Sequence, residues 1–96
     1  MSKKDAYLEK LHSKLDEWNA EIDKLKAKLD AAGAEKRVEY QEQIQNLKQK
    51  QKEVEQKMAT MRSAGGDAWE DLKKGVESAW DAMESAMKAA KTRFNK

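Results

Sequence analysis

Large apolar residues recur along the first third of this 96-residue chain at alternating steps of three and four positions. This spacing is the a/d pattern of a coiled coil, which places a narrow apolar seam on one side of a helix and turns it toward another helix. The pattern predicts an all-α protein and makes these residues candidates for an oligomer seam. The seam consists of Leu8, Leu11, Leu15, Trp18, Ile22, Leu25 and Leu29.

Composition favours long helices and argues against several other classes of protein. Charged residues make up 40% of the chain, and Pro and Cys are absent, so no Pro interrupts a helix and no thiolate can bind a metal. Charges of both signs are interleaved and the net charge is only +2, so no field of one sign is expected to attract nucleic acid. Residues 1–5 do not resemble the start of a signal peptide, and no window is apolar enough to span a bilayer. We expect a cytoplasmic protein.

A second apolar ladder follows, out of phase with the first by one residue. Either one helix continues with a local discontinuity in its seam, or the chain turns at residues 31–34. Gly33 would suit a left-handed C-cap, but residues 34–37 offer no Ser, Thr, Asp or Asn to cap a second helix. The sequence therefore favours one long helix over about residues 3–62, capped by Ser2, with the break at 31–34 as the alternative. The second ladder comprises Tyr40, Ile44, Leu47, Gln51, Val54, Met58 and Met61.

A clearer break follows at residues 63–66, where paired glycines predict a turn. Asp67 is the expected N-cap of a C-terminal helix over residues 67–94, with Glu70 at capping-box spacing. This shorter helix is expected to fold back antiparallel on the second ladder, forming a helical hairpin in which Trp69 and Trp80 are buried. The residues expected to pack in the hairpin are Tyr40, Ile44, Leu47, Val54, Met58, Met61, Trp69, Leu72, Val76, Trp80, Met83, Met87 and Phe94.

These segments predict a single helical coiled-coil domain over residues 1–96. In a monomer with a straight long helix the first seam would stay exposed, whereas two antiparallel chains would cover it. We therefore favour a domain-swapped antiparallel dimer over a monomeric three-helix bundle, although both share the same local three-helix packing. Gln51 occupies a seam position, where a polar side chain commonly fixes register at some cost in stability.

No residue pattern points to catalysis, to a cofactor or to a metal. Glu9 and His12 form one Glu-x-x-His pair, whereas di-iron bundles need two such pairs and further inward glutamates. Alternate lysines at 48, 50 and 52 lie about 200° apart on a helix and so do not form one phosphate-binding stripe. We expect a non-enzymatic protein without catalytic residues, cofactor or metal, and nucleic acid is not an expected partner.

The expected function is that of a self-associating coiled-coil structural or interaction protein, with a dimer favoured and a further, unidentified protein partner left open. The alternative is a peripheral membrane-surface or lipid-binding protein that uses the amphipathic C-terminal helix, whose apolar face carries Trp69, Trp80 and Phe94. The polar face of that helix has as many acids as bases, so it would gain little from anionic lipid. The same aromatic residues also suit burial against a neighbouring helix.

Three stretches of the chain carry a resemblance to a known family. They are residues 6–25 around Trp18, residues 39–44, and the block Gly-Asp-Ala-Trp-Glu-Asp-Leu-Lys at 66–73 with Ala79-Trp80 and Arg93-Phe94 behind it. Together they resemble a family of small bacterial coiled-coil proteins often labelled stress-response proteins. The resemblance covers nearly the whole chain, and the block at 66–73 is its most specific part. It implies a bacterial, cytoplasmic protein with a role in stress tolerance, and it implies no catalytic residue or ligand.

Overall fold

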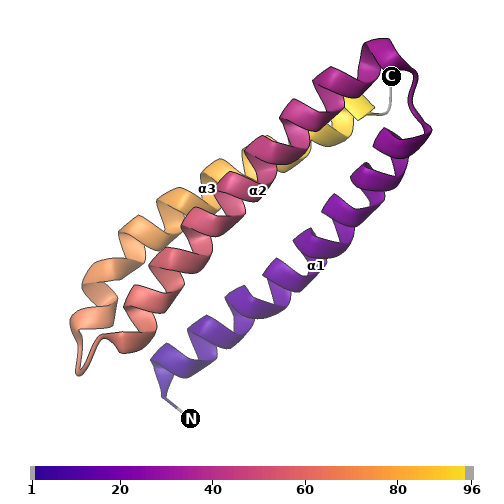
Figure 1. Cartoon of the computed structure of the whole chain (residues 1–96). Coiled ribbons are helices and arrows are strands. Elements are labelled where there is room, and N and C mark those ends of the chain that lie inside the picture. Colours follow the sequence, from indigo (N-terminus) through magenta and orange to yellow (C-terminus); the bar gives the residue numbers. More distant parts are fainter. Residues whose placement is uncertain (1, 95–96) are drawn as a thin grey trace.

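The computed structural model describes residues 2–94 and consists of three α-helices, each antiparallel to the next, joined by two short turns (Figure 1). Helix α1 spans Lys3–Ala31, α2 spans Ala34–Ser63 and α3 spans Ala68–Phe94. The bundle is elongated and measures 52 × 20 × 18 Å along its principal axes. Among the described residues, no helix combines the length and the apolar character needed to cross a membrane.

The chain turns between α1 and α2, so the favoured continuous helix over about residues 3–62 is wrong and the alternative break at 31–34 is confirmed. Ala32 (φ −80°, ψ 150°) and Gly33 (φ −69°, ψ 163°) are both extended. The Ala32 N–H donates to the Leu29 carbonyl at 3.1 Å, and the Gly33 carbonyl accepts the Lys36 and Arg37 N–H groups, also at 3.1 Å. Gly33 is therefore the N-cap of α2 and not a left-handed cap of α1.

The physical reason for the turn is the apolar seam on α1. A straight helix would leave that seam in water within a single chain, and burying one large apolar side chain contributes about 1.5–3 kcal/mol. Folding α1 back buries most of the seam against α2 and α3, while Leu29, closest to the turn, is only partly covered. The buried residues of the first seam are Leu8, Leu11, Leu15, Trp18, Ile22 and Leu25.

The second ladder and the inner face of α3 complete a single core. Every residue of the second ladder is buried, including Gln51, and on α3 only Leu72 and Trp80 of the expected packing residues are partly exposed. Two small residues of α3, Ala79 and Ala90, are also buried. The buried side chains of α3 are Trp69, Val76, Ala79, Met83, Met87, Ala90 and Phe94.

The second turn, between α2 and α3, differs in geometry from the first. Gly66 has φ 58°, in the left-handed region that favours glycine, and Asp67 immediately precedes α3. The Lys4 ammonium donates hydrogen bonds to the carbonyls of Arg62 (3.1 Å) and Ala64 (3.0 Å). The start of α1 thus binds the end of α2 and holds this turn from outside.

Candidate functional site

The candidate site is the α1 interface, the surface at which α1 packs against the hairpin formed by α2 and α3. The hairpin helices pack most extensively on each other, whereas α1 packs chiefly on α2 and touches α3 less (Figure 1). Helix α1 is therefore the element held least tightly in the bundle. Its interface joins apolar, aromatic, amide and charged side chains from all three helices.

Two pairs of aromatic rings connect α1 to α3. Tyr7 lies against Trp69 with ring centroids 6.1 Å apart and an interplanar angle of 44°. Trp18 lies against Trp80 at 4.3 Å and 38°. The expectation that both α3 tryptophans pack on the second ladder therefore missed their ring partners, which lie on α1. The physical reason is the turn at residues 32–33, which brings α1 beside α3, and Trp80 stays partly exposed at that edge.

A lysine and a third ring pair extend this aromatic arrangement. The Lys73 ammonium lies 5.1 Å from the ring centroids of both Tyr7 and Trp69, a distance at which a cation is attracted to an aromatic face. At the other end of the bundle Tyr40 of α2 stacks on Phe94 of α3, with centroids 4.0 Å apart and planes 19° apart. Each aromatic ring of α3 thus contacts an aromatic ring of another helix.

An amide pair crosses the interface between α1 and α2. The Gln51 side chain is 8% exposed, and its Nε2 donates a hydrogen bond to Oδ1 of Asn19. Within the part of the chain that the structure describes, every buried side-chain nitrogen and oxygen has a hydrogen-bond partner. The polar seam position noticed in the sequence therefore has a partner on α1, and sequence spacing alone did not identify that partner.

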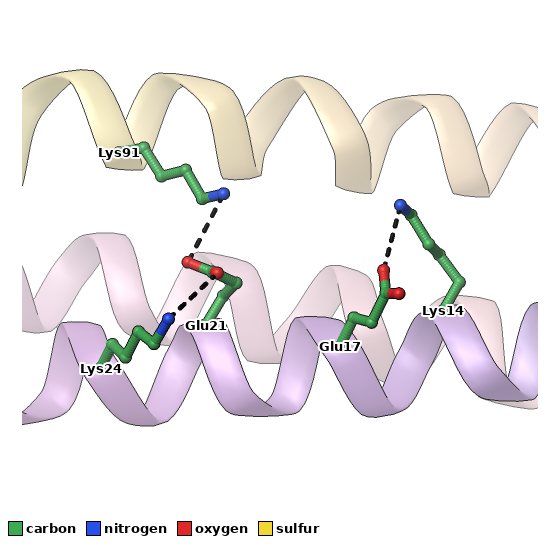
Figure 2. Close-up of polar contacts among 5 residues, drawn as sticks. All are labelled: Lys14, Glu17, Glu21, Lys24 and Lys91. Atoms are coloured by element: carbon green, nitrogen blue, oxygen red, sulfur yellow. Dashed lines mark ion pairs between the residues drawn. The ribbon is translucent and has the colours of Figure 1, made fainter.

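Ion pairs line the edge where α1 faces α3 (Figure 2). Lys91 of α3 lies 3.4 Å from Glu21 of α1, and Lys24 lies 3.7 Å from the same carboxylate. Lys14 and Glu17, one helical turn apart on α1, form a pair at 3.2 Å. The four other side chains are largely exposed and Glu21 is half-buried, and surface pairs of this kind contribute only about 0–1 kcal/mol each. Only the Lys91–Glu21 pair crosses between the helices, so it favours the alignment of α1 on α3 and adds little to the affinity.

A groove runs along the same edge, with an apolar floor and charged rims of both signs. Burial raises the pKa of the Tyr7 hydroxyl, and the negative charge of Glu77 and a side-chain hydrogen bond with it raise that pKa further. A phenol held neutral in this way suits hydrogen bonding more than proton transfer at neutral pH. The groove is lined by Tyr7, Lys10, Leu11, Ser13, Lys14, Glu17, Glu77 and Trp80.

On the opposite edge of α1, two lysines from different helices come together. A side-chain contact with Lys26 of α1 and repulsion between the two positive charges lower the pKa of Lys48 on α2, while Asp23 opposes this effect. The spacing of lysines along one helix does not reveal this pair, because its two members lie on different helices that the turn brings side by side. His12 faces α2 in a shallow pocket with Glu55. Within residues 2–94, no three His, Asp or Glu side chains converge in a way that could hold a metal ion.

The side chains that meet at the α1 interface are suited to binding another helix. They provide an apolar seam, an internal amide pair and an edge of weak ion pairs. Comparison of the chain with protein-family models, with curated proteins and with solved structures gave no match. The α1 interface is therefore the feature of the structure that bears on function.

Proposed function

We propose that this chain is a non-enzymatic helical protein that acts by self-association, and that two copies associate by exchanging α1. The observation that carries this proposal is the short connection between α1 and α2, which consists only of Ala32 and Gly33. When a short linker joins an element to its packing surface, the same interface can form within one chain or between two chains. The exchanged assembly is an antiparallel dimer.

The energetics of the α1 interface support such an exchange. The six buried residues of the first seam would each stay buried if α1 packed on the hairpin of a second copy. The Tyr7–Trp69 and Trp18–Trp80 contacts would form in the same way between chains. Exchange therefore loses no packing, and its balance depends on the linker and on protein concentration.

Sedimentation equilibrium of the full chain tests this proposal. A sample refolded at high micromolar concentration should show a mass near twice the chain mass of 11.0 kDa, in a fraction that grows with concentration. Leu15→Glu should abolish the dimer, because Leu15 is 3% exposed in the interface. Ala20→Glu, on the exposed side of α1 and away from the groove, is the matched control and should dimerise normally. A wild-type mass of 11.0 kDa at every concentration would contradict self-association.

The resemblance to bacterial stress-response proteins extends this proposal to the cell. A strain that lacks the protein should lose viability under heat or oxidant stress, and wild-type protein should restore it. Restoration by Ala20→Glu but not by Leu15→Glu, at equal protein levels, would connect the cellular role to the α1 interface. Equal restoration of viability by both variants would show that the cellular role does not depend on the α1 interface.

A second candidate function is binding to a membrane surface through α3. The partial exposure of Trp80 favours it, because this ring lies on the apolar face of α3 beside the groove. Trp69 is 7% exposed, so deeper lipid contact would require α1 to leave the hairpin. Co-sedimentation with anionic phosphatidylglycerol vesicles tests this candidate. Binding that is lost in Trp80→Ala would support it, and a protein that stays in the supernatant would exclude it.

A further inference from the structure

The linker between α1 and α2 has φ angles close to those of an α-helix. They are −80° at Ala32 and −69° at Gly33, against about −63° in a regular helix. Only the ψ angles, 150° and 163°, differ from the helical value of about −42°. We infer that rotation at these two ψ angles is the switch that joins α1 and α2 into one helix and delivers α1 to a second copy of this chain. This inference rests on the proposed function and names the residues that control it.

Hydrogen bonding favours the joined helix. Every helix end leaves backbone groups without intrahelical partners, and joining α1 to α2 removes one C-terminus and one N-terminus. Gly33 supplies no side-chain hydrogen bond as the N-cap of α2, so little is lost when that cap disappears. The bond from the Arg37 N–H to the Gly33 carbonyl already has helical spacing and would remain. The linker is therefore held in its turn mainly by the packing of α1 on its own hairpin.

The second turn would need a larger change to become helix. Gly66 has φ 58°, and a helix would require this angle to change sign. Helix α3 is therefore expected to stay on the α2 of its own chain in both states. The difference between the turns makes α1 the exchanged element and leaves the α2–α3 hairpin as the unit that receives it.

When α1 leaves its own hairpin, it uncovers a surface on α2 and α3. The Asn19–Gln51 amide pair favours the α1 helix of a second copy as the element that covers this surface. When α1 leaves, the buried Gln51 side chain loses its bond to Asn19. An apolar helix in that place would leave the Gln51 amide unpaired, which is costly for a buried polar group. The α1 helix of a second copy presents Asn19 at the same level and restores the bond.

Substitutions at Gly33 test the switch in opposite directions. Proline fixes φ near −65° and restricts the preceding residue to extended conformations, which matches the geometry of Gly33 and Ala32 in the turn. Gly33→Pro should therefore keep the monomer folded and weaken dimerisation by at least about 100-fold, because proline disrupts a joined helix. Gly33→Ala should strengthen dimerisation by about tenfold or more, because alanine favours the helix and no atom lies within 4 Å of an added Cβ.

The experiment refolds each full-length variant from denaturant over a range of concentrations and measures the dimer fraction by sedimentation velocity. Gly65→Ala, the same type of change at the second turn, is the control and should dimerise like wild type. Circular dichroism of the Gly33→Pro monomer should show wild-type helicity. To identify exchanged chains, Glu21→Cys and Lys91→Cys are introduced together, because these side chains pair across the α1–α3 edge at 3.4 Å. A short bismaleimide should link them between chains in the dimer.

The outcomes separate the inference from the proposed function. Wild-type protein that never dimerises would overturn both. Wild type and folded Gly33→Pro that dimerise equally would overturn the switch and leave the exchange of α1. Cysteines that crosslink only within chains of the isolated dimer would overturn both the switch and the exchange, and would leave self-association through another surface. Loss of the dimer in Gly33→Pro together with its gain in Gly33→Ala is the result expected.

Discussion

The two turns of the bundle both reverse the chain, but they differ in how firmly they are fixed. The first contains two extended residues with negative φ, Ala32 and Gly33. The second contains Gly66 in the left-handed region, and the Lys4 ammonium binds two carbonyls beside it. A turn with negative φ values can become helix through rotation of ψ, whereas a left-handed glycine must also reverse its φ. The comparison therefore divides the molecule into an α1 arm and an α2–α3 hairpin.

The largest expected effect comes from separating the arm from the hairpin. Leu15→Glu combined with Ile22→Glu places two charges at positions that are each 3% exposed, and a buried unpaired charge costs several kcal/mol. Urea titration followed by circular dichroism should show loss of the α1 contribution at low urea, with α2 and α3 unfolding later. Ala20→Glu with Ala27→Glu, on the exposed face of α1, should change stability by less than about 0.5 kcal/mol. A single unfolding transition that removes all helicity would show that α1 and the α2–α3 hairpin are not separate units.

The next effect tests how strongly the second turn is anchored. Trp69 stands at the start of α3 and is 7% exposed, so Trp69→Ala should cost about 3–5 kcal/mol. Trp80→Ala should cost less, because Trp80 is only partly buried beside Trp18. Urea denaturation midpoints of the two variants, measured at low protein concentration, provide the comparison. Equal losses would show that the turn-proximal ring has no special anchoring role.

Alanine substitution probes the two turns directly, with a smaller effect. Gly66→Ala should cost about 1–2 kcal/mol, because a side chain at φ 58° is strained. Gly33→Ala should change the stability of the monomer by less than about 0.5 kcal/mol, since its φ is negative and the space around it is open. Thermal denaturation at low micromolar concentration measures both changes. A larger loss of stability in Gly33→Ala than in Gly66→Ala would show that the first turn, and not the second, is the more firmly fixed.

The smallest effect concerns Tyr7, which lies against Trp69 beside the second turn. Burial and the nearby Glu77 carboxylate raise the pKa of Tyr7 above its ordinary value of 10.0, so the neutral phenol is favoured in the folded state. The stability due to this shift is fully present below pH 10.0 and is lost as pH rises through the folded-state pKa. In a Tyr40→Phe background, tyrosinate absorbance should appear at lower pH when Glu77 is replaced by Gln. An unchanged titration would show that Glu77 does not influence this ring.

Much of the fold follows from periodicity, because burial on a helix repeats with the helical turn. The seam from Leu8 to Leu25 and the ladder from Tyr40 to Met61 are buried as their spacing suggests, and α3 begins one residue after the expected cap at Asp67. Ser2 accepts the Asp5 N–H at 3.1 Å, as its capping position predicted. Such features depend on residues close together in the sequence, so local reasoning recovers them.

The break at residues 32–33 was harder to predict, because a straight and a folded chain form the same local core. The residues around Gly33 are good helix formers, so local preference argued against a turn that tertiary packing of α1 produces. The partners of Trp69 and Trp80, the Asn19–Gln51 bond and the influence of Lys26 on Lys48 join residues far apart in the sequence, and within one chain they form only when the chain turns there. Sequence spacing could identify the packing faces but not the helix that each face would meet.

The shortness of both turns also has a kinetic consequence. Each helix packs against the helix next to it in sequence, and proteins with such local contacts fold within microseconds to milliseconds. Two helices joined by two residues meet each other far sooner than either meets another molecule in dilute solution. A nascent or diluted chain should therefore fold as a monomer first. This monomer should be kinetically trapped, because α1 can pack on a second copy only after partial unfolding separates it from its own hairpin. Heat, which accelerates unfolding severalfold for every ten degrees, would then set the rate at which copies pair.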